Sequence, residues 1–345
     1  MNNPLISVII VTYNSDEYLR DCLESLFRVT YKNLEIHIID NNSKDKTRGI
    51  INSFRKRISH IFLDANVGYA GANNIGIKNA NGEFVFLLNP DTKVDIHIFD
   101  NLLKAFRNNA NMVVGQPVVY LMKDPKRLNC TGKVTHFMGF DWVRDYKKIT
   151  YPREGEIMSF SGCGVMIKKS VFTVTKAFDP NYTMYYEDSD LSWRLRLFGY
   201  KLMFVPSAIM YHDYKYIPVE RYQTLKSKLF YNERNRIMTF YKNYSMRTIV
   251  LLLPSALFLE FCMVVYALSG GWFIEKIKGY ISIIALRHSL QKNRVFVQKN
   301  RIVSDREITR NFMSTLNMEI YNNGAVKLFI NPMLSCYWGL VKRFI

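Results

Sequence analysis

Short apolar runs alternate with segments of helical spacing along the first third of the chain, and this alternation limits the fold more than any other feature. The run LISVIIV at 5–11 is continuous, as is typical of a strand buried on both faces of a sheet. The segment after it places Leu19, Leu23 and Leu26 on one helical face. Strands and helices in alternation predict an α/β fold, with a mostly parallel sheet and helices on both of its faces.

The same unit recurs as far as residue 119 and returns after a break. Further strands are predicted at 34–39, 61–63, 84–88, 112–119, 160–168 and 201–205. Further helices are predicted at 44–58, 70–80, 96–106, 187–198 and 219–244. Segment 120–157 is rich in charge and short on periodicity, so we expect a loop-rich insertion there.

Polar residues and glycines follow four of the predicted strands. They are Thr12, Tyr13 and Asn14 after the first, Asp40 and Asn42 after the second, Gly68 and Gly71 after the third, and Asn89 and Asp91 after the fourth. Ligands bind beyond the carboxyl ends of the strands in sheets of this type. Turn and cap preferences explain each loop equally well by itself, but four such ends at one sheet edge favour a ligand site.

The carboxylate of Asp91 stands two residues after the side-chain amide of Asn89. Oxygen ligands of these two kinds suit a hard divalent cation held beside a diphosphate. His212 lies at the end of a later predicted strand, and an imidazole ligand would favour Mn²⁺ over Mg²⁺. A histidine taken alone is more often structural, so the metal site is a hypothesis that needs the fold.

Three acids crowd the start of the helix predicted from residue 187, namely Glu187, Asp188 and Asp190. Acids stabilise the positive end of a helix dipole, so capping explains them about as well as catalysis does. The alternative is a general base that takes a proton from an acceptor hydroxyl. The sequence pattern leaves both interpretations open.

Positive charge and apolar residues gather in the same part of the chain. The full sequence has 47 Lys and Arg against 29 Asp and Glu, a net charge of +18, and residues 211–345 hold 20 of those bases and 8 of those acids. They also contain the most apolar run, 248–268. This pairing favours a membrane surface over nucleic acid as the partner. The apolar stretch after Met1 is too short to predict a signal peptide.

Seven motifs in order resemble the inverting glycosyltransferases of family 2 with the GT-A fold, especially the branch of rhamnosyl- and galactofuranosyltransferases. They are SVIIVTYNS, IIDNNSKD, NVGYAGANNIGI, FLLNPDT, SGCGVMIKKSVF, FDPNYTMYYEDSDLSWRLRLFGYK and VPSAIMYHD, which together span 6–212 apart from the unassigned middle. The resemblance implies a GT-A catalytic domain at 1–215, with a nucleotide-sugar half at 1–120 and an acceptor half at 155–215. A basic helical region at 216–345 would follow it.

The resemblance also implies roles for single residues. The nucleotide would be bound by Thr12, Tyr13, Asn14 and Asp40, and its ribose, diphosphate or sugar by Asn42, Gly68, Gly71 and Asn73. The metal ligands would be Asp91 and His212, the general base Asp188, and the residues shaping donor-sugar and acceptor space Gly162, Glu187 and Trp193. Asn89 stands where the family's DxD motif has its first acid, and this substitution removes one negative charge from the metal site.

The implied reaction is metal-dependent transfer, with Mn²⁺ or Mg²⁺, from a UDP- or dTDP-sugar to a hydroxyl of a lipid-linked glycan. Two alternatives stay open: a polyprenyl-phosphate glycosyltransferase and a non-catalytic protein that binds nucleotide sugars. We expect the chain at the cytoplasmic face of a membrane. Pro254, Glu260 and the basic tail disfavour a single crossing by 248–268, so a re-entrant or interfacial helix pair is preferred. A spanning helix is the second alternative, and a buried core or dimer helix is the third. The sequence does not determine the oligomeric state.

Overall fold

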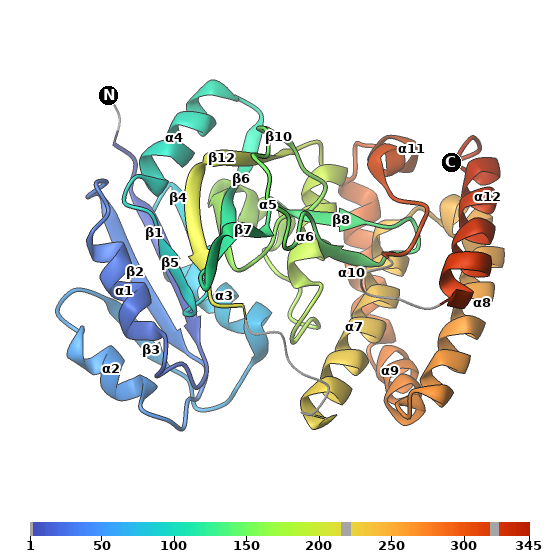
Figure 1. Ribbon diagram of the computed structural model, residues 1–345, viewed down its shortest axis with the longest axis horizontal. Coiled ribbons are helices and arrows are strands. Elements are labelled where there is room, and N and C mark those ends of the chain that lie inside the picture. Colours follow the sequence, from blue (N-terminus) through green and yellow to red (C-terminus); the bar gives the residue numbers. More distant parts are fainter. Residues whose placement is uncertain (1–2, 215–221, 318–323) are drawn as a thin grey trace. The chain divides into compact units, whose positions relative to one another are not determined.

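The computed structural model describes residues 3–214, 222–317 and 324–345, which fold as two compact units (Figure 1). Unit 1 consists of Met1–Lys133, Val143–Leu195 and Tyr200–Lys215, and unit 2 of Val134–Trp142, Arg196–Gly199 and Tyr216–Ile345. The main division therefore falls after residue 215, while two short segments from earlier in the chain belong to unit 2.

Unit 1 is built on one mixed sheet. Its strands are β1 (Ile6–Thr12), β2 (Leu34–Asp40), β3 (Ser59–Phe62), β4 (Phe84–Leu88), β5 (Thr92–Val94), β6 (Met112–Leu121), β7 (Asp124–Cys130), β10 (Gly155–Glu156), β11 (Gly164–Lys168) and β12 (Lys201–His212). The order is β10-β12-β6-β11-β4-β1-β2-β3, with β5 paired to β12 and β7 to β6. Strands β4, β1, β2 and β3 are parallel, so their carboxyl ends meet at one edge. A separate two-stranded sheet, β8 (Lys133–Thr135) with β9 (Asp141–Val143), has most of its residues in unit 2.

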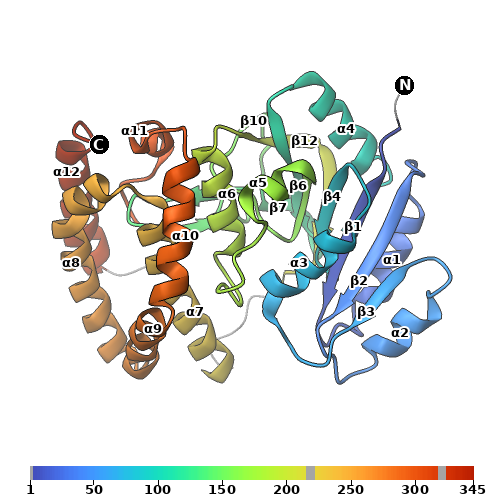
Figure 2. The same cartoon turned by 180° about the vertical axis from the view of Figure 1, so that it is seen from behind.

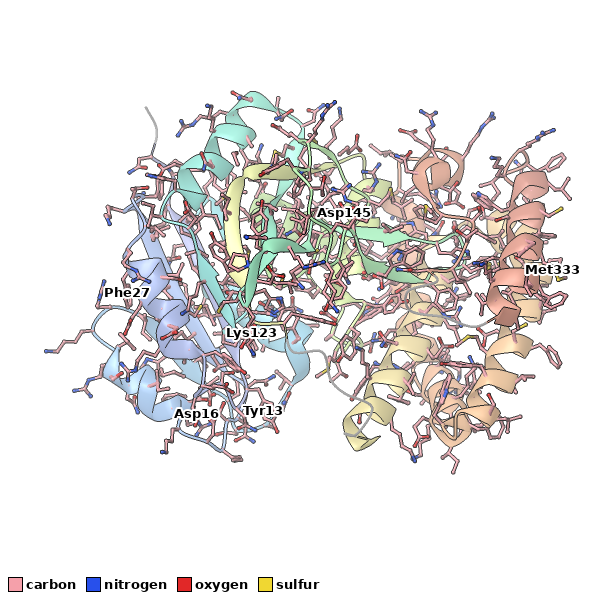
Figure 3. The ribbon with its side chains drawn as sticks, viewed as in Figure 1. Tyr13, Asp16, Phe27, Lys123, Asp145 and Met333 are labelled. Carbon is pink, nitrogen blue, oxygen red and sulfur yellow. The ribbon has the colours of Figure 1, made fainter. Side chains whose placement is uncertain are left out.

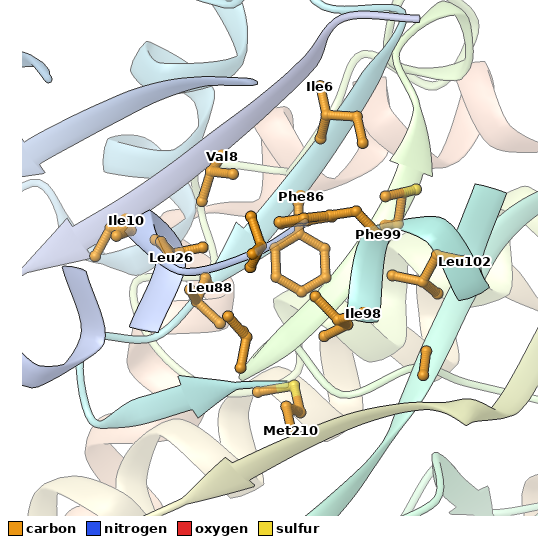
Figure 4. Packing of buried hydrophobic residues seen from close by; sticks show 14 of the residues in the cluster. Ile6, Val8, Ile10, Leu26, Phe86, Leu88, Ile98, Phe99, Leu102 and Met210 are labelled. Atoms are coloured by element: carbon orange, nitrogen blue, oxygen red, sulfur yellow. The ribbon is translucent and has the colours of Figure 1, made fainter. Parts of the chain in front are cut away.

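Helices cover both faces of this sheet, because successive residues of each strand point to opposite sides. On one face Ile6, Val8 and Ile10 pack with α1 (Leu19–Phe27), α2 (Thr47–Ser53) and α4 (Ile98–Asn108). On the other face Ile9 and Val11 pack with α3 (Gly68–Asn79), α5 (Ser170–Thr175) and α6 (Glu187–Leu197). Figure 4 shows the first cluster, where the ring of Phe86 meets that of Phe99 edge to face with centroids 5.1 Å apart. The fold is thus the three-layer α/β arrangement that the alternation predicts.

The segment predicted to be a loop-rich insertion contains β7 and three shorter strands, so that prediction was wrong in its detail. Strand β7 begins with exposed polar residues and becomes buried only near Cys130, which conceals its periodicity in the sequence. Strand β12 also continues past the predicted end at 205 to His212, with a register shift between Val205 and Ile209. Pro206, which cannot donate to the ladder, lies within that shift.

Unit 2 is helical (Figure 2). Its helices are α7 (Tyr222–Asn243), α8 (Met246–Ser269), α9 (Phe273–Ala285), α10 (Arg287–Asn300), α11 (Asp305–Ile308) and α12 (Asn331–Val341), with a 3₁₀ turn at Thr309–Asn311 and a π-helical turn at Val326–Ile330. The first residues of the helix predicted at 219–244 lie outside the described residues. Among the described residues, α8 is the one helix that is long and apolar enough to cross a membrane.

Candidate active site

The loops after β1 and β2 are joined by hydrogen bonds. The N–H of Asn14 donates to Ser43 Oγ at 2.9 Å, and the N–H of Lys44 donates to Asn14 Oδ1 at 2.8 Å. Asn14 and Asn42 have φ angles of 50° and 68°, a left-handed conformation that asparagine tolerates better than most residues. Tyr13, beside them, is 52% exposed and lies near Asp16 at the rim of unit 1 (Figure 3). The two loops therefore form one edge that hydrogen bonds hold in place, and this edge carries the exposed ring of Tyr13.

The carboxylate of Asp40 is fully buried beneath this edge. It accepts hydrogen bonds from Thr12 Oγ1 at 3.1 Å, from the N–H of Ser43 at 3.2 Å and from Arg48 Nε at 2.7 Å. The sequence indicated Thr12 and Asp40. It did not indicate Arg48, because an arginine in a polar surface helix gives no sign of a buried partner. Binding of a nucleotide base by Asp40 stays a prediction.

The glycine-rich segment at the start of α3 has tight packing constraints. Gly68 has a φ of +76°, and a Cβ there would lie 2.5 Å from the carbonyl oxygen of Thr183. A Cβ on Gly76 would lie 2.5 Å from Ile9 Cγ2, so this glycine lets α3 approach β1. At Gly71 the nearest neighbour would be Val67 Cγ2 at 3.1 Å, and Asn73 is buried with its amide donating to the carbonyl of Tyr69. Packing accounts for these residues, and their binding roles stay predictions.

Sheet register brings Asp91 and His212 together. Strand β5 runs antiparallel to β12 with Thr92 opposite His212, and the N–H of Asp213 donates to the carbonyl of Asp91 at 2.9 Å. As a result His212 Nε2 lies 3.3 Å from Asp91 Oδ2. The other ring nitrogen, Nδ1, is 2.9 Å from Oδ1 of Asn129 on β7. The sequence pointed to Asp91 and His212. It gave no sign of Asn129, which lies in segment 120–157, where the sequence pattern did not reveal the strands.

The chemistry of this pair fits a divalent cation. When Nδ1–H donates to Asn129, the lone pair of Nε2 faces the carboxylate of Asp91, so two acceptors lie at a separation that suits a shared proton or two neighbouring ligands of one cation. Asp91 Oδ1 is buried and has no hydrogen-bond partner among the described residues. Those residues contain no group of three His, Cys, Asp or Glu side chains that would hold a metal. A cation here would therefore need further ligands from a bound molecule.

The carboxylate of Asp188, in the first turn of α6, accepts hydrogen bonds on both oxygens. Oδ1 accepts from Lys133 Nζ at 2.7 Å and from the N–H of Ser189 at 2.8 Å. Oδ2 accepts from the N–H of Gly162 at 3.0 Å. Each partner donates, so the site is arranged for the ionised carboxylate, the form that can take a proton. Lys133 lies in the unassigned middle of the sequence, where one lysine among many gives no signal.

The acids beside Asp188 have different surroundings. Asp190 is fully buried and accepts from Arg194 Nε at 2.9 Å, and Arg194 also donates to two backbone carbonyls. This contact makes Asp190 a structural ion pair. Glu187 and Trp193 are also buried. Tyr185 and Tyr186, just before the helix, have φ angles of 65° and 68°, a conformation that costs about 1–2 kcal/mol per residue and sets where α6 begins.

The Asp91 loop and Asp188 are linked by two adjacent residues. The N–H of Asn89, at the end of β4, donates to the carbonyl of Cys163 at 2.9 Å. The neighbouring Gly162 donates to Asp188, and its carbonyl accepts from Tyr69 Oη at 2.7 Å. Burial raises the pKa of Tyr69 well above its ordinary value, so its hydroxyl stays protonated as the donor. The fold thus brings the Asp91–His212 pair and the candidate base Asp188 into one hydrogen-bonded region.

Residues 7–174 match the family model of glycosyl transferase family 2. This part of the chain belongs to that family. Among curated proteins, poly-beta-1,6-N-acetyl-D-glucosamine synthase of Staphylococcus epidermidis is 31% identical over 208 residues, which are 59% of this chain and 48% of the relative. The synthase of the same name from Staphylococcus aureus is 28% identical over the same length. The chain spans about half the length of these relatives.

Solved structures show the same GT-A fold at low identity. GalNAc-T7, in a crystal structure with UDP, GalNAc and Mn²⁺, has a TM-score of 0.56 and 16% identity, over 71% of this chain and 49% of that one. The mannosyltransferase PcManGT from Pyrobaculum calidifontis, in complex with GDP-Man and Mn²⁺, has a TM-score of 0.51 and 15% identity, over 87% and 88%. The glycosyl transferase domain therefore has the fold that its motifs predict.

Proposed function

We propose that the chain is an inverting, metal-dependent glycosyltransferase. It moves a rhamnose- or hexose-type sugar from a UDP- or dTDP-sugar to a hydroxyl of a lipid-linked glycan in cell-surface polysaccharide assembly. The observation that carries the proposal is the link, through Gly162 and Cys163, between the Asp91–His212 pair and Asp188. Relatives named for a poly-N-acetylglucosamine product support the hexose-type donor.

The donor would lie along the edge formed by the loops after β1, β2 and β4. Tyr13 offers an exposed ring for stacking on the base, and Asp40 is already fixed by Arg48 and Thr12. Asp91 and His212 would hold a divalent cation, which when bound supplies positive charge beside the diphosphate. Because Asn89 is neutral, the protein supplies a single carboxylate there, and the diphosphate would provide further ligands.

Asp188 would act as the general base through Oδ2. Lys133 and the N–H of Ser189 hold Oδ1, whereas Oδ2 has one backbone donor and keeps a lone pair for an acceptor hydroxyl. The acceptor oxygen loses its proton to Oδ2 and bonds to the anomeric carbon. The bond from that carbon to the diphosphate oxygen breaks on the opposite face, so the configuration inverts.

Two other functions predict different behaviour. A polyprenyl-phosphate acceptor is already ionised and needs no base, so the ordered carboxylate of Asp188 favours a hydroxyl acceptor. A non-catalytic protein that binds nucleotide sugars would explain Asn89, but it gives no reason for the contacts that order Asp188 and His212. We place the chain at the cytoplasmic face of a membrane, where nucleotide sugars and lipid-linked glycans meet.

Thermal unfolding with a panel of UDP- and dTDP-sugars, each with Mn²⁺, Mg²⁺ or EDTA, tests the donor site. We expect one sugar nucleotide to raise the Tm only when a divalent cation is present. The matched variant Asp91→Asn should lose that dependence and keep its Tm without ligand. No shift with any donor would contradict the proposal, and a shift without sugar transfer to any acceptor would favour the non-catalytic alternative.

A further inference from the structure

The outer side of α8 is apolar over most of its length. Its exposed residues include Val250, Leu253, Leu257, Phe261, Val265 and Leu268, each at least 48% accessible. They recur every three or four positions, so they form one helical face. Monomeric proteins in water rarely leave a continuous apolar stripe of this length uncovered.

Two helices of unit 2 that contact α8 also expose apolar side chains. Ile274, Ile281 and Ile284 of α9 are each at least 60% exposed. Helix α12 packs beside α8, where Tyr337 Oη donates to the carbonyl of Leu251 at 2.6 Å. Met333 on α12 is 53% exposed and lies on its outer side in Figure 3. We call the exposed apolar residues of α8, α9 and α12 the apolar face.

The inner side of α8 carries charge instead. Glu260 accepts from Lys276 Nζ at 2.8 Å and from Tyr280 Oη at 2.6 Å, and it also pairs with Arg236. Lys276 Nζ also reaches Glu233 at 2.7 Å, and Arg236 pairs with the same carboxylate. We call Glu233, Arg236, Glu260 and Lys276 the ionic cluster. The ionic cluster joins α8 to α7 and α9. If α8 crossed a bilayer, these two acids and two bases would be carried into the hydrocarbon.

Among the described residues, the exposed charges on these helices and their immediate flanks have one sign. They are Arg247, Lys278, Arg287, Lys327, Lys342 and Arg343. Of the acids on these helices, Glu260 is in the ionic cluster and Glu275 is half-buried. A second copy of the chain would bring like charges together, whereas an anionic lipid surface matches both the charge and the apolar side chains.

We propose that α8, α9 and α12 dock unit 2 onto an anionic bilayer, with α8 lying in the plane of the interface rather than crossing it. The apolar face enters the boundary between headgroups and acyl chains, and the basic residues contact the headgroups. This inference rests on the proposed placement at a membrane, and it specifies the docking helices and the charge of the lipid. Vesicle binding needs neither donor nor acceptor, so its outcome is separate from that of transfer activity.

Vesicle flotation of the full chain tests the docking. Phosphatidylcholine vesicles are compared with vesicles that contain phosphatidylglycerol. The wild type should float with the anionic vesicles, and the double variant Leu257→Gln, Phe261→Gln should bind at least about tenfold more weakly. The pair Lys278→Glu, Arg343→Glu should lose the preference for anionic lipid. Tyr151→Gln, which removes a 96% exposed aromatic ring from unit 1, is the matched control and should bind as the wild type does.

Three results would overturn the proposal. They are equal vesicle binding by the wild type and the double variant, retention in the membrane after carbonate washing at high pH, and a lipid-free dimer that the double variant converts to monomer. The second would indicate a spanning helix and the third self-association. Circular dichroism and a thermal melt of each variant show whether it folds, and the substituted residues are exposed, so folding should be retained.

Discussion

The two units distribute polar and apolar side chains in opposite ways. In unit 1 apolar residues fill both faces of the sheet, and the carboxylates of Asp91 and Asp188 are held by specific partners near strand ends. In unit 2 three residues of the ionic cluster are buried and Glu260 is partly buried, whereas the apolar face is exposed. This difference agrees with the two proposals, a polar ligand at unit 1 and a lipid surface at unit 2. Substitution of Asp188 in unit 1 should therefore affect catalysis, whereas substitution within the ionic cluster of unit 2 should affect stability.

The largest effect is expected from Asp188→Asn. The amide cannot take a proton, so kcat should fall about 100- to 10,000-fold while donor binding and folding are kept. Initial-rate kinetics on the full chain and a thermal melt measure both quantities. The matched control is Asp190→Asn, two residues on, which breaks the buried pair with Arg194 and should lower stability instead. Equal turnover by Asp188→Asn and the wild type would remove Asp188 from the mechanism.

The second prediction addresses unit 2 through Lys276→Met. Lys276 is 1% exposed and contacts both carboxylates of the ionic cluster, so its loss leaves the buried Glu233 and the partly buried Glu260 facing one guanidinium. Breaking a buried pair in this way costs about 3–5 kcal/mol of unfolding free energy. Urea denaturation without lipid measures it, with Lys278→Met as an exposed control on the same helix, expected within about 0.5 kcal/mol of the wild type. If the two variants are equally stable, the cluster does not hold unit 2 together.

Much of unit 1 could be predicted because its strands are short apolar runs, as at Ile6–Thr12, and its ligand edge follows from parallel topology. The contacts that complete the site could not be predicted. They pair Lys133 with Asp188, Asn129 with His212 and Arg48 with Asp40, and each joins segments that lie apart in the sequence. A polar or charged residue in a polar stretch gives no local sign of its partner. In unit 2 the apolar run at 248–268 was evident, but the burial of its single acid depends on α7 and α9, which only the tertiary structure shows.

The third prediction concerns acid. Burial, together with the nearby charge of Arg236, lowers the pKa of His136 in unit 2 to about 3, although the interaction of its ring with the backbone carbonyl of Ser314 opposes the shift. The unfolded chain has an ordinary value of about 6.5 and binds the proton more readily. The stability from neutral His136 is thus complete above pH 6.5 and is lost as the pH falls toward 3, by about 1.4 kcal/mol per pH unit. Unfolding free energies from pH 7 to pH 4 should fall less steeply in His136→Gln, and parallel curves would refute the assignment.

The smallest effect is expected from Lys133→Met, because Lys133 acts on the reaction only through the orientation of Asp188. The ammonium group holds Oδ1 at 2.7 Å together with the N–H of Ser189, which leaves Oδ2 toward an acceptor. Without this contact the carboxylate can rotate, and kcat should fall about 10- to 100-fold with the donor KM unchanged. Lys133→Arg should recover part of the loss, since it restores a charged donor, and Lys126→Met on the exposed start of β7 should have no effect. A purely structural role would lower the Tm of Lys133→Met without separating kcat from KM, and the arginine variant would then give no catalytic rescue.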